Sequence, residues 1–223
     1  EEHSGKTFIP TPFQQGMANL GARVMLQAGC GQGKTLAAYY WAKAQLERGE
    51  FGRLIFLYPT RGTATQGFLD YTGWAPEEDA LLMHGCAKYV LESISENPTE
   101  ATENKNYLPE SDARLFSLAN YRRRFFSATV DQFLSFLQLD YSSLLMSVIL
   151  TDSLVILDEV HSYDPKLFGT VIEFLKLMNI PTLCMTATLP TSRAKRLELV
   201  KLEFYPKNNA SARKALEEKE STP

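Results

Sequence analysis

The chain has 223 residues, of which 44% are hydrophobic and 22% are charged, and its formal net charge is −3. At roughly 100–200 residues per domain, this length supports one large domain or two small ones. The apolar content and the low count of 13 glycines exclude a disordered or collagen-like chain. A small negative charge provides no overall attraction to nucleic acid, so any such function must rest on local sites.

Signals for export or membrane insertion are not seen in the sequence. The apolar stretches at 144–150 and 154–157 are far shorter than the ~20 residues of a membrane helix. Residues 1–4 are neither basic nor apolar, as a secretory signal would require. The three cysteines are widely spaced and include no Cys-x-x-Cys pair. We therefore expect a cytoplasmic protein without a membrane partner and, since no initiating Met is present, a segment of a longer protein.

Short apolar runs alternate with segments that suit helices. The predicted strands are 24–28, 54–58, 154–158 and 182–187, and the predicted helices are 34–48, 64–70, 130–138 and 167–178. Continuous rather than alternating hydrophobicity is typical of strands that are buried on both faces. The pattern predicts an α/β fold with a doubly wound, mostly parallel sheet and with functional loops at the carboxyl ends of the strands.

Two polar stretches interrupt or follow this pattern. Residues 95–112 carry five acidic residues and one lysine, which predicts an exposed insertion at about 92–114. Residues 191–223 are also polar and predict a terminal helix that leads into an interdomain linker. We therefore predict one main domain over residues 1–190.

A glycine-rich loop follows the first predicted strand. Residues 28–35 read Ala-Gly-Cys-Gly-Gln-Gly-Lys-Thr, the P-loop pattern with Ala28 where the first glycine usually stands. The residues expected to surround nucleotide phosphates are Gly29, Gly31, Gln32, Gly33, Lys34 and Thr35. Lys34 is expected to reach the β- and γ-phosphates, and the Thr35 hydroxyl to hold Mg²⁺. Alternatively, the segment is a glycine turn that happens to contain Lys-Thr.

An acidic pair follows the third predicted strand. Asp158 is expected to bind Mg²⁺, and Glu159 to orient or deprotonate the attacking water. On its own, such a pair is equally typical of a helix N-terminus, where carboxylates suit the helix dipole. His161, three residues after Asp158, is a further catalytic candidate, although a lone histidine is often structural. The P-loop and the acidic pair together predict the two halves of an ATP site.

Five blocks of sequence resemble the first motor domain of superfamily 2 helicases of the DEAH type. They are Lys34-Thr35, Pro59–Arg61, Thr129–Gln132, Asp158–His161 and Thr186–Thr188, in the family's order. Within the superfamily, two segments resemble the CRISPR-associated helicase–nucleases of type I interference systems. They are Asp-Glu-Val-His-Ser-Tyr-Asp at 158–164 and Met-Thr-Ala-Thr-Leu-Pro at 185–190.

This resemblance implies a RecA-like P-loop NTPase domain that hydrolyses ATP with Mg²⁺. It implies 3′-to-5′ movement on single-stranded DNA in the prokaryotic cytoplasm, after recruitment to a target-bound surveillance complex. Gln14 stands where such proteins carry a glutamine that reads the adenine, and its amide can both donate and accept. Phe8 or Phe13 either packs on the purine or belongs to the core.

The resemblance also assigns residues to the nucleic acid and to coupling. Those expected to hold the DNA backbone are Thr60, Arg61, Thr63, Gln66 and Thr129. The same threonines are also compatible with helix capping. Thr186 and Thr188 are expected to couple the ATP site to the DNA through hydrogen bonds with the loop at 158–161. Alternatively, these two threonines only end a strand.

Two parts of such a motor are not found in the sequence. The second motor domain, which completes the ATP site, has no counterpart after residue 191, so this chain alone is expected to turn over ATP weakly or not at all. Each of His3, His84 and His161 is followed by Ser or Gly rather than by the Asp of a metal-dependent nuclease, so no nuclease activity is expected. The alternatives are half of a DEAH-like RNA helicase, and a docking module that binds nucleotide without turnover.

Overall fold

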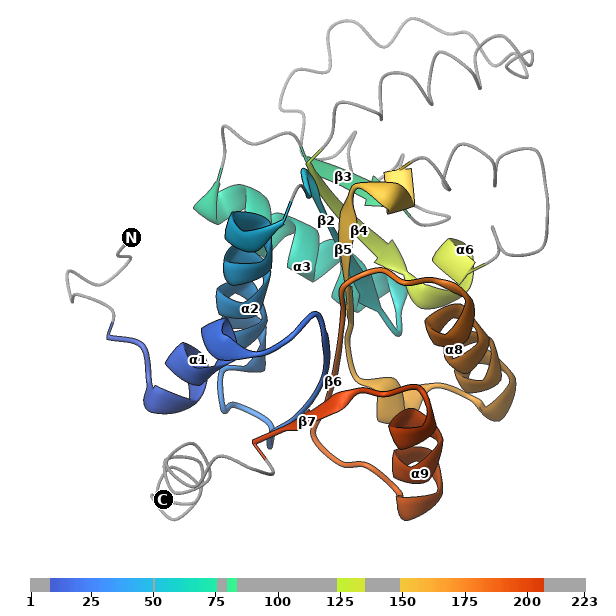
Figure 1. Ribbon diagram of the computed structural model, residues 1–223. Coiled ribbons are helices and arrows are strands. Elements are labelled where there is room, and N and C mark those ends of the chain that lie inside the picture. Colours follow the sequence, from blue (N-terminus) through green and yellow to red (C-terminus); the bar gives the residue numbers. More distant parts are fainter. Residues whose placement is uncertain (1–8, 50, 76–79, 84–123, 135–148, 207–223) are drawn as a thin grey trace, which may run out of the picture.

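The computed structural model describes residues 9–49, 51–75, 80–83, 124–134 and 149–206. Within these ranges seven parallel strands form one sheet in the order β3-β4-β2-β5-β6-β1-β7 (Figure 1). The strands are β1 (Arg23–Gln27), β2 (Arg53–Tyr58), β3 (Ala80–Met83), β4 (Phe125–Thr129), β5 (Ser153–Leu157), β6 (Thr182–Thr186) and β7 (Glu203–Tyr205). The helices are α1 (Pro12–Gly16), η1 (Met17–Asn19), α2 (Lys34–Arg48), α3 (Arg61–Trp74), α6 (Val130–Leu134), η4 (Val160–Ser162), α8 (Pro165–Leu177) and α9 (Thr191–Leu199). The predicted doubly wound α/β fold is confirmed.

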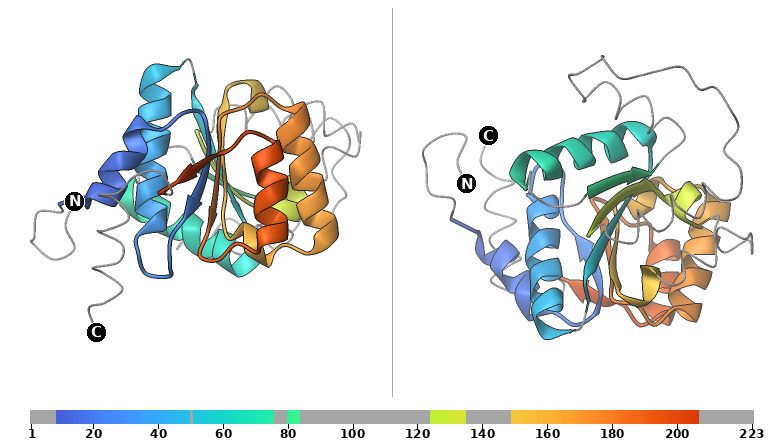
Figure 2. Two further views of the ribbon diagram at one scale, coloured as in Figure 1. Left: turned by 60° about the horizontal axis from the view of Figure 1, so that its bottom comes forward. Right: turned by 90° about the horizontal axis from the view of Figure 1, so that it is seen from above.

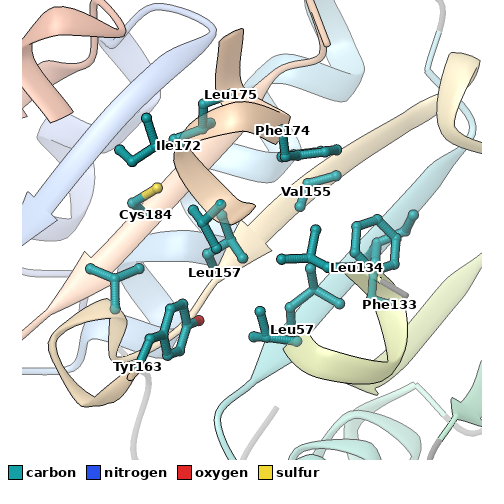
Figure 3. Packing of buried hydrophobic residues seen from close by; sticks show 14 of the residues in the cluster. Leu57, Phe133, Leu134, Val155, Leu157, Tyr163, Ile172, Phe174, Leu175 and Cys184 are labelled. Carbon is teal, nitrogen blue, oxygen red and sulfur yellow. The ribbon is translucent and has the colours of Figure 1, made fainter. Parts of the chain in front are cut away.

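Helices cover both faces of the sheet (Figures 1 and 2). Residues of α1, α2 and α3 pack on one face, and residues of α6, α8 and α9 pack on the other. Successive strand residues serve the two cores in turn: Leu54 and Phe56 face the first, Ile55 and Leu57 the second. Figure 3 shows the second core, in which Phe174 of α8 packs near strand β5. Burial on both faces explains why the strands appear as continuous apolar runs.

Local capping signals set the starts of two helices. The Thr60 hydroxyl accepts the Thr63 N–H at 3.2 Å, so α3 begins at residue 61, earlier than the predicted residue 64. Asp164 accepts two backbone N–H bonds at 2.8 and 2.9 Å ahead of Pro165, so α8 begins two residues before its predicted start. The bounds of α2 agree with the predicted helix. None of the described helices has both the length and the apolar composition needed to span a bilayer.

The domain continues beyond residue 190, the boundary that the sequence predicts. Strand β7 pairs in parallel with β1, with Tyr205 opposite Leu26, and Leu197 of α9 is fully buried. The sequence pattern missed β7 because it is a three-residue edge strand that follows a polar helix. Strands β3 and β4 were also missing from the prediction. The predicted insertion at about 92–114 and the tail at 207–223 lie outside the described residues.

Candidate active site

Three neighbouring strands bring the predicted nucleotide residues to one edge of the sheet. Strands β5, β6 and β1 are adjacent and parallel, so their carboxyl ends reach the same edge. Just beyond the paired strands, the Ala28 N–H donates to the carbonyl oxygen of Thr186 at 3.1 Å. The phosphate loop after β1 (residues 28–35) therefore lies beside the loop after β6, which follows Thr186 and contains Thr188. The acidic loop after β5 (residues 158–164) lies next to them.

The phosphate loop has the backbone of an anion site. Gly31 and Gly33 have φ angles of 73° and 81°, in the left-handed region that glycine enters without a Cβ clash. Among the described residues, no side chain caps α2 at Gly33. The first N–H groups of this helix are therefore available at the positive end of its dipole. This arrangement suits the phosphates of a nucleotide.

Gln14 lies against the phosphate loop. A Cβ added at Gly33 would lie 2.6 Å from Nε2 of Gln14. The Gln14 side chain is buried, and its Oε1 accepts the Thr11 N–H at 2.9 Å, in a capping box that begins α1. This bond leaves Nε2 facing the loop. Phe13, in contrast, is 1% exposed and stacks on Tyr205 with ring centroids 5.6 Å apart, so it belongs to the core.

Lys34 joins the phosphate loop to the acidic loop. Its Nζ donates to the carbonyl oxygen of Gly29 at 3.3 Å and lies 3.2 Å from Oε1 of Glu159. The side chains of Lys34 and Glu159 are only 10% and 26% exposed. Their charges are therefore screened less by water than those of a surface pair.

Asp158 and Thr35 line one pocket of about 170 Å³. Burial raises the pKa of Asp158 from 3.8 to about 6, and the nearby negative charge of Glu159 adds to this effect. The Glu159 N–H, which donates to Oδ1 of Asp158 at 2.9 Å, and the charge of Lys34 act in the opposite direction. A cation bound nearby would stabilise the ionised form of this carboxyl group, because positive charge favours the carboxylate.

These residues fit a nucleotide that is bound with magnesium. Mg²⁺ in such sites is held by a carboxylate and a hydroxyl together with phosphate oxygens, and Asp158 and Thr35 supply these two groups in one pocket. Gln32 of the phosphate loop is buried, and its Oε1 has no hydrogen-bond partner among the described residues. An orphaned buried acceptor of this kind is expected where a ligand completes the hydrogen bonding.

The Glu159 carboxylate lies at the centre of a polar cluster. Oε1 faces Lys34, whereas Oε2 lies 3.0 Å from Nδ1 of His161 and accepts the Ala187 N–H at 3.3 Å. The backbone of Glu159 is left-handed, with φ 47°, which is uncommon for a residue other than glycine. Strain of this kind is often found at functional sites, where the surroundings hold it in place.

His161 connects this cluster to the loop after β6. The Thr186 hydroxyl donates to the carbonyl oxygen of Thr188 at 2.7 Å and lies 2.8 Å from Nδ1 of His161. Because the hydroxyl proton is used on Thr188, Nδ1 of His161 carries a proton and donates to Thr186. The structure thus brings together the two predicted coupling threonines and the predicted histidine, with Thr188 contributing its backbone.

Comparison with known sequences decides the family. Residues 11–197 match the sequence model of the DEAD/DEAH box helicases, which is most of the chain. The chain belongs to the DEAD/DEAH box helicase family. The chain is 39% identical over 189 residues to the CRISPR-associated nuclease/helicase Cas3 of Myxococcus xanthus, and 29% identical over 202 residues to that of Methanocaldococcus jannaschii. These matches cover 82% and 86% of this chain but 24% and 26% of the relatives, so the chain spans about a quarter of their length.

Solved helicase structures share the fold. Cas3 of T. fusca with AMPPNP gives a TM-score of 0.66 at 22% identity and covers 86% of this helicase chain, which matches 23% of that chain. The Hef helicase domain of Pyrococcus furiosus gives 0.60 at 18% identity, with 92% of this chain and 39% of that one covered. The predicted RecA-like fold and the predicted resemblance to CRISPR-associated helicases are therefore confirmed.

The N-terminal part of α3 and its cap carry four of the five predicted nucleic-acid residues. Thr60, Arg61, Thr63 and Gln66 are all exposed there. Both threonine hydroxyls take part in the cap of the helix, since Thr63 Oγ1 donates to the carbonyl oxygen of Thr60 at 2.9 Å. The amide of Gln66 donates to Asp70 at 2.7 Å, and both residues line the pocket that contains Asp158. Capping, the alternative role for these threonines, is thus observed.

Thr129 lies on a different element from the other predicted nucleic-acid residues. This residue ends β4, is 3% exposed, and is followed directly by α6. Strand β4 is buried on both faces up to this last residue. Contact of Thr129 with a DNA phosphate stays a prediction.

Sequence reasoning missed several residues that shape the helicase site. Tyr163 is 2% exposed and donates its hydroxyl to the carbonyl oxygen of Asp158 at 2.7 Å. The Ser162 hydroxyl donates to the carbonyl oxygen of Glu159 at 2.8 Å. Both residues come three to four positions after Glu159, so their nearness to the acidic pair in the sequence was the available signal. Arg193, which also contacts this loop, lies outside the motifs, and no sequence signal pointed to it.

Proposed function

We propose that this chain is the first motor domain of an ATP-dependent helicase that moves 3′ to 5′ along single-stranded DNA in CRISPR interference. The observation that carries the proposal is the connected set of Lys34, Glu159, His161 and Thr186, which links the phosphate loop, the acidic loop and the loop after β6. The similarity to two Cas3 proteins supports the choice of a DNA helicase of CRISPR systems among the helicases of this family.

ATP binding rests on the phosphate loop and on Gln14. The N–H groups from Gly29 to Thr35 and the ammonium group of Lys34 hold the phosphates. The Nε2 group of Gln14 faces the same loop, and its amide donates to the adenine edge. Magnesium, when bound by Asp158 and Thr35, neutralises charge that develops on the phosphates.

Hydrolysis rests on Glu159. Its carboxylate orients the attacking water and accepts a proton from it. The Ala187 N–H donates to Oε2 at 3.3 Å, and Nδ1 of His161 lies 3.0 Å from the same oxygen. Lys34 lies on the opposite oxygen, so the two oxygens of one carboxylate meet different partners. A carboxylate held on both oxygens keeps a defined orientation for the water.

Coupling to the nucleic acid runs through His161 and Thr186. A shift of Glu159 changes the hydrogen bond of His161, and Thr186 passes this change to the loop after β6. On the same edge of the sheet, the first turn of α3 presents Arg61 and backbone N–H groups to the DNA phosphates. Contacts of this kind hold a strand without reading its bases, as a moving motor requires.

The remaining parts of the motor belong to a longer protein. Because the chain spans about a quarter of the Cas3 relatives, we propose that a second motor domain completes the ATP site and that a CRISPR surveillance complex recruits the whole protein. Cytoplasmic location follows from the same proposal.

A Glu159→Gln variant tests the proposal in the protein that includes its second motor domain. ATP turnover stimulated by single-stranded DNA is expected to fall by about 100-fold or more, because the general base is lost. The matched control is Glu173→Gln, which removes only an exposed surface pair with Lys176. In the unmodified protein, stimulation of ATP turnover by DNA but not by RNA is expected.

Two results would support the alternatives. Stronger stimulation by RNA than by DNA would identify half of an RNA helicase. Nucleotide binding without turnover, and with no effect of Glu159→Gln, would identify a docking module. Either result would overturn the proposed DNA translocase.

A further inference from the structure

Arg193 lies on α9, outside every recognised motif, yet its side chain contacts the acidic loop. Its Nη1 donates to the carbonyl oxygens of Val160 and His161 at 2.8 and 2.9 Å, and its Nη2 donates to that of Tyr163 at 2.6 Å. One guanidinium group therefore satisfies three carbonyls of the segment that carries the acidic pair. The planar fork of an arginine is suited to such a set of acceptors, and a lysine is not.

Most backbone carbonyl groups of the acidic loop accept hydrogen bonds from side chains. The Tyr163 hydroxyl donates to the carbonyl of Asp158, and the hydroxyl and N–H of Ser162 donate to that of Glu159, each at 2.7 to 2.8 Å. Arg193 supplies the donors for the carbonyls of Val160, His161 and Tyr163. Because η4 is only three residues long, its backbone bond from Ser162 to Glu159 leaves these three carbonyls to other donors. The shape of the loop therefore depends partly on Arg193, which lies outside it.

Arg193 is itself held in place by an aromatic ring. Its guanidinium carbon lies 4.7 Å from the ring centroid of Phe168, which is 1% exposed at the start of α8. The side chain is thus fixed between the core of the second face and the acidic loop. A cation with four such contacts has little freedom to move away from the loop.

We infer that Arg193 is a positioning residue for hydrolysis: it holds the loop in the shape that directs Glu159 and His161 towards the nucleotide. The inference rests on the proposed function of Glu159. The left-handed backbone of Glu159, with φ 47°, costs free energy that the surrounding bonds must offset. With Arg193 present, the peptide groups of Val160 and His161 are fixed. The His161 ring then meets Thr186, and the Glu159 carboxylate meets Lys34.

Arg196 provides a matched control on the same helix. Its guanidinium carbon lies 5.2 Å from the centroid of the same Phe168 ring. Among the described residues, however, Arg196 makes no hydrogen bond to the acidic loop. Replacing Arg196 therefore removes a charge and a ring contact of the same kind and leaves the carbonyl groups of the loop bonded.

The test measures turnover and nucleotide affinity separately, in the protein that includes its second motor domain. For Arg193→Ala, kcat for ATP is expected to fall by about 100-fold, because a small misplacement of catalytic groups is costly. The affinity for ADP is expected to change by no more than about twofold, because the phosphate loop is not touched and binding is separable from turnover. Arg196→Ala is expected to leave both values unchanged.

A second variant covers the case in which Arg193→Ala does not fold. Arg193→Lys keeps the positive charge above Phe168 but replaces the two nitrogens of the planar fork with a single one. Its kcat is therefore expected to fall while its melting temperature stays close to that of Arg196→Lys.

Equal kcat values for the variants at 193 and 196 would overturn the inference. A parallel decrease of kcat, ADP affinity and melting temperature in the variants at both positions would also overturn it, because that result would indicate a purely structural contact. The Glu159→Gln variant separates this result from failure of the proposed function. If Glu159→Gln abolishes turnover while the variants at 193 do not reduce it, only the role of Arg193 is wrong.

Discussion

The ammonium group of Lys34 lies 3.2 Å from Oε1 of Glu159, so one ion pair joins the loop after β1 to the loop after β5. These residues are 125 positions apart in the sequence and meet because β1 and β5 flank β6 in the sheet. The pair places the phosphate loop and the acidic loop on the same edge. A motor domain of this kind requires that placement.

Replacing Lys34 with alanine should abolish most of the affinity for magnesium-ATP. The variant loses a charge-assisted contact with the phosphates, so we expect binding to weaken by about 10- to 100-fold. Titration calorimetry measures this directly. The control is Lys43→Ala on the same helix, since Lys43 is 74% exposed and pairs with Glu47 at the surface. Equal affinities for the two variants would refute the assigned phosphate loop.

Replacing Gly33 with alanine should impair adenine recognition as well as stability. The alanine must adopt a φ of 81°, and its Cβ would lie 2.6 Å from Nε2 of Gln14, so Gln14 has to move. Gly31→Ala is the matched control, because its φ is 73° but nothing lies within 4 Å of the added atom. Both variants should lose about 1–2 kcal/mol of unfolding free energy. Only Gly33→Ala should also lose the preference for ATP over GTP, measured by competition binding.

Replacing Asp158 with asparagine should stabilise the fold near neutral pH. The pKa of Asp158 is raised from 3.8 to about 6, so the folded protein holds this proton more tightly than the unfolded chain. The ionised carboxyl therefore destabilises the fold fully above pH 6, and the cost disappears as the pH falls towards 4.

Urea denaturation without nucleotide checks this expectation. Asp158→Asn should raise the free energy of unfolding by about 1–2 kcal/mol at pH 7 and should have little effect near pH 4. Asp131→Asn, at an exposed position in α6, serves as the control. The Asp158 variant should also lose the magnesium dependence of ATP binding. A lower stability than that of the unmodified protein at pH 7 would contradict the prediction.

Replacing Tyr205 with phenylalanine should weaken the link between β7 and α1. The Tyr205 hydroxyl donates to the carbonyl oxygen of Phe13 at 2.9 Å, and burial raises the pKa of this hydroxyl to about 12, so it remains a donor. Its loss should cost about 1–3 kcal/mol, because the Phe13 carbonyl is left buried without that partner. Thermal and urea unfolding measure the change.

The control for this variant is Tyr40→Phe on α2, at a half-buried position. Phe13 directly precedes Gln14, so a weaker affinity for ATP should accompany the loss of stability in the Tyr205 variant alone. An unchanged stability would show that the hydroxyl contributes nothing to the link.

The individual halves of the ATP site could be predicted from the sequence. A strand followed by a glycine-rich loop and a helix identified residues 28–35. The bounds of α2 were predicted correctly because the helix begins after Gly33 and ends before Gly49. The apolar run before Asp158 identified a buried strand with an acidic end. Such signals are local, since each depends on residues that are neighbours in the chain.

Only the tertiary structure decided what these halves contact. Three contacts join residues that no sequence periodicity relates. They are the approach of Gln14 to Gly33, the hydrogen bond between His161 and Thr186, and the hydrogen bonds of Arg193 to the acidic loop. The burial of Thr129 was likewise hidden, because a residue's exposure depends on the strands and helices packed around it. Local propensity thus determined the elements and the motif residues, whereas the order of the strands in the sheet determined which side chains share one site.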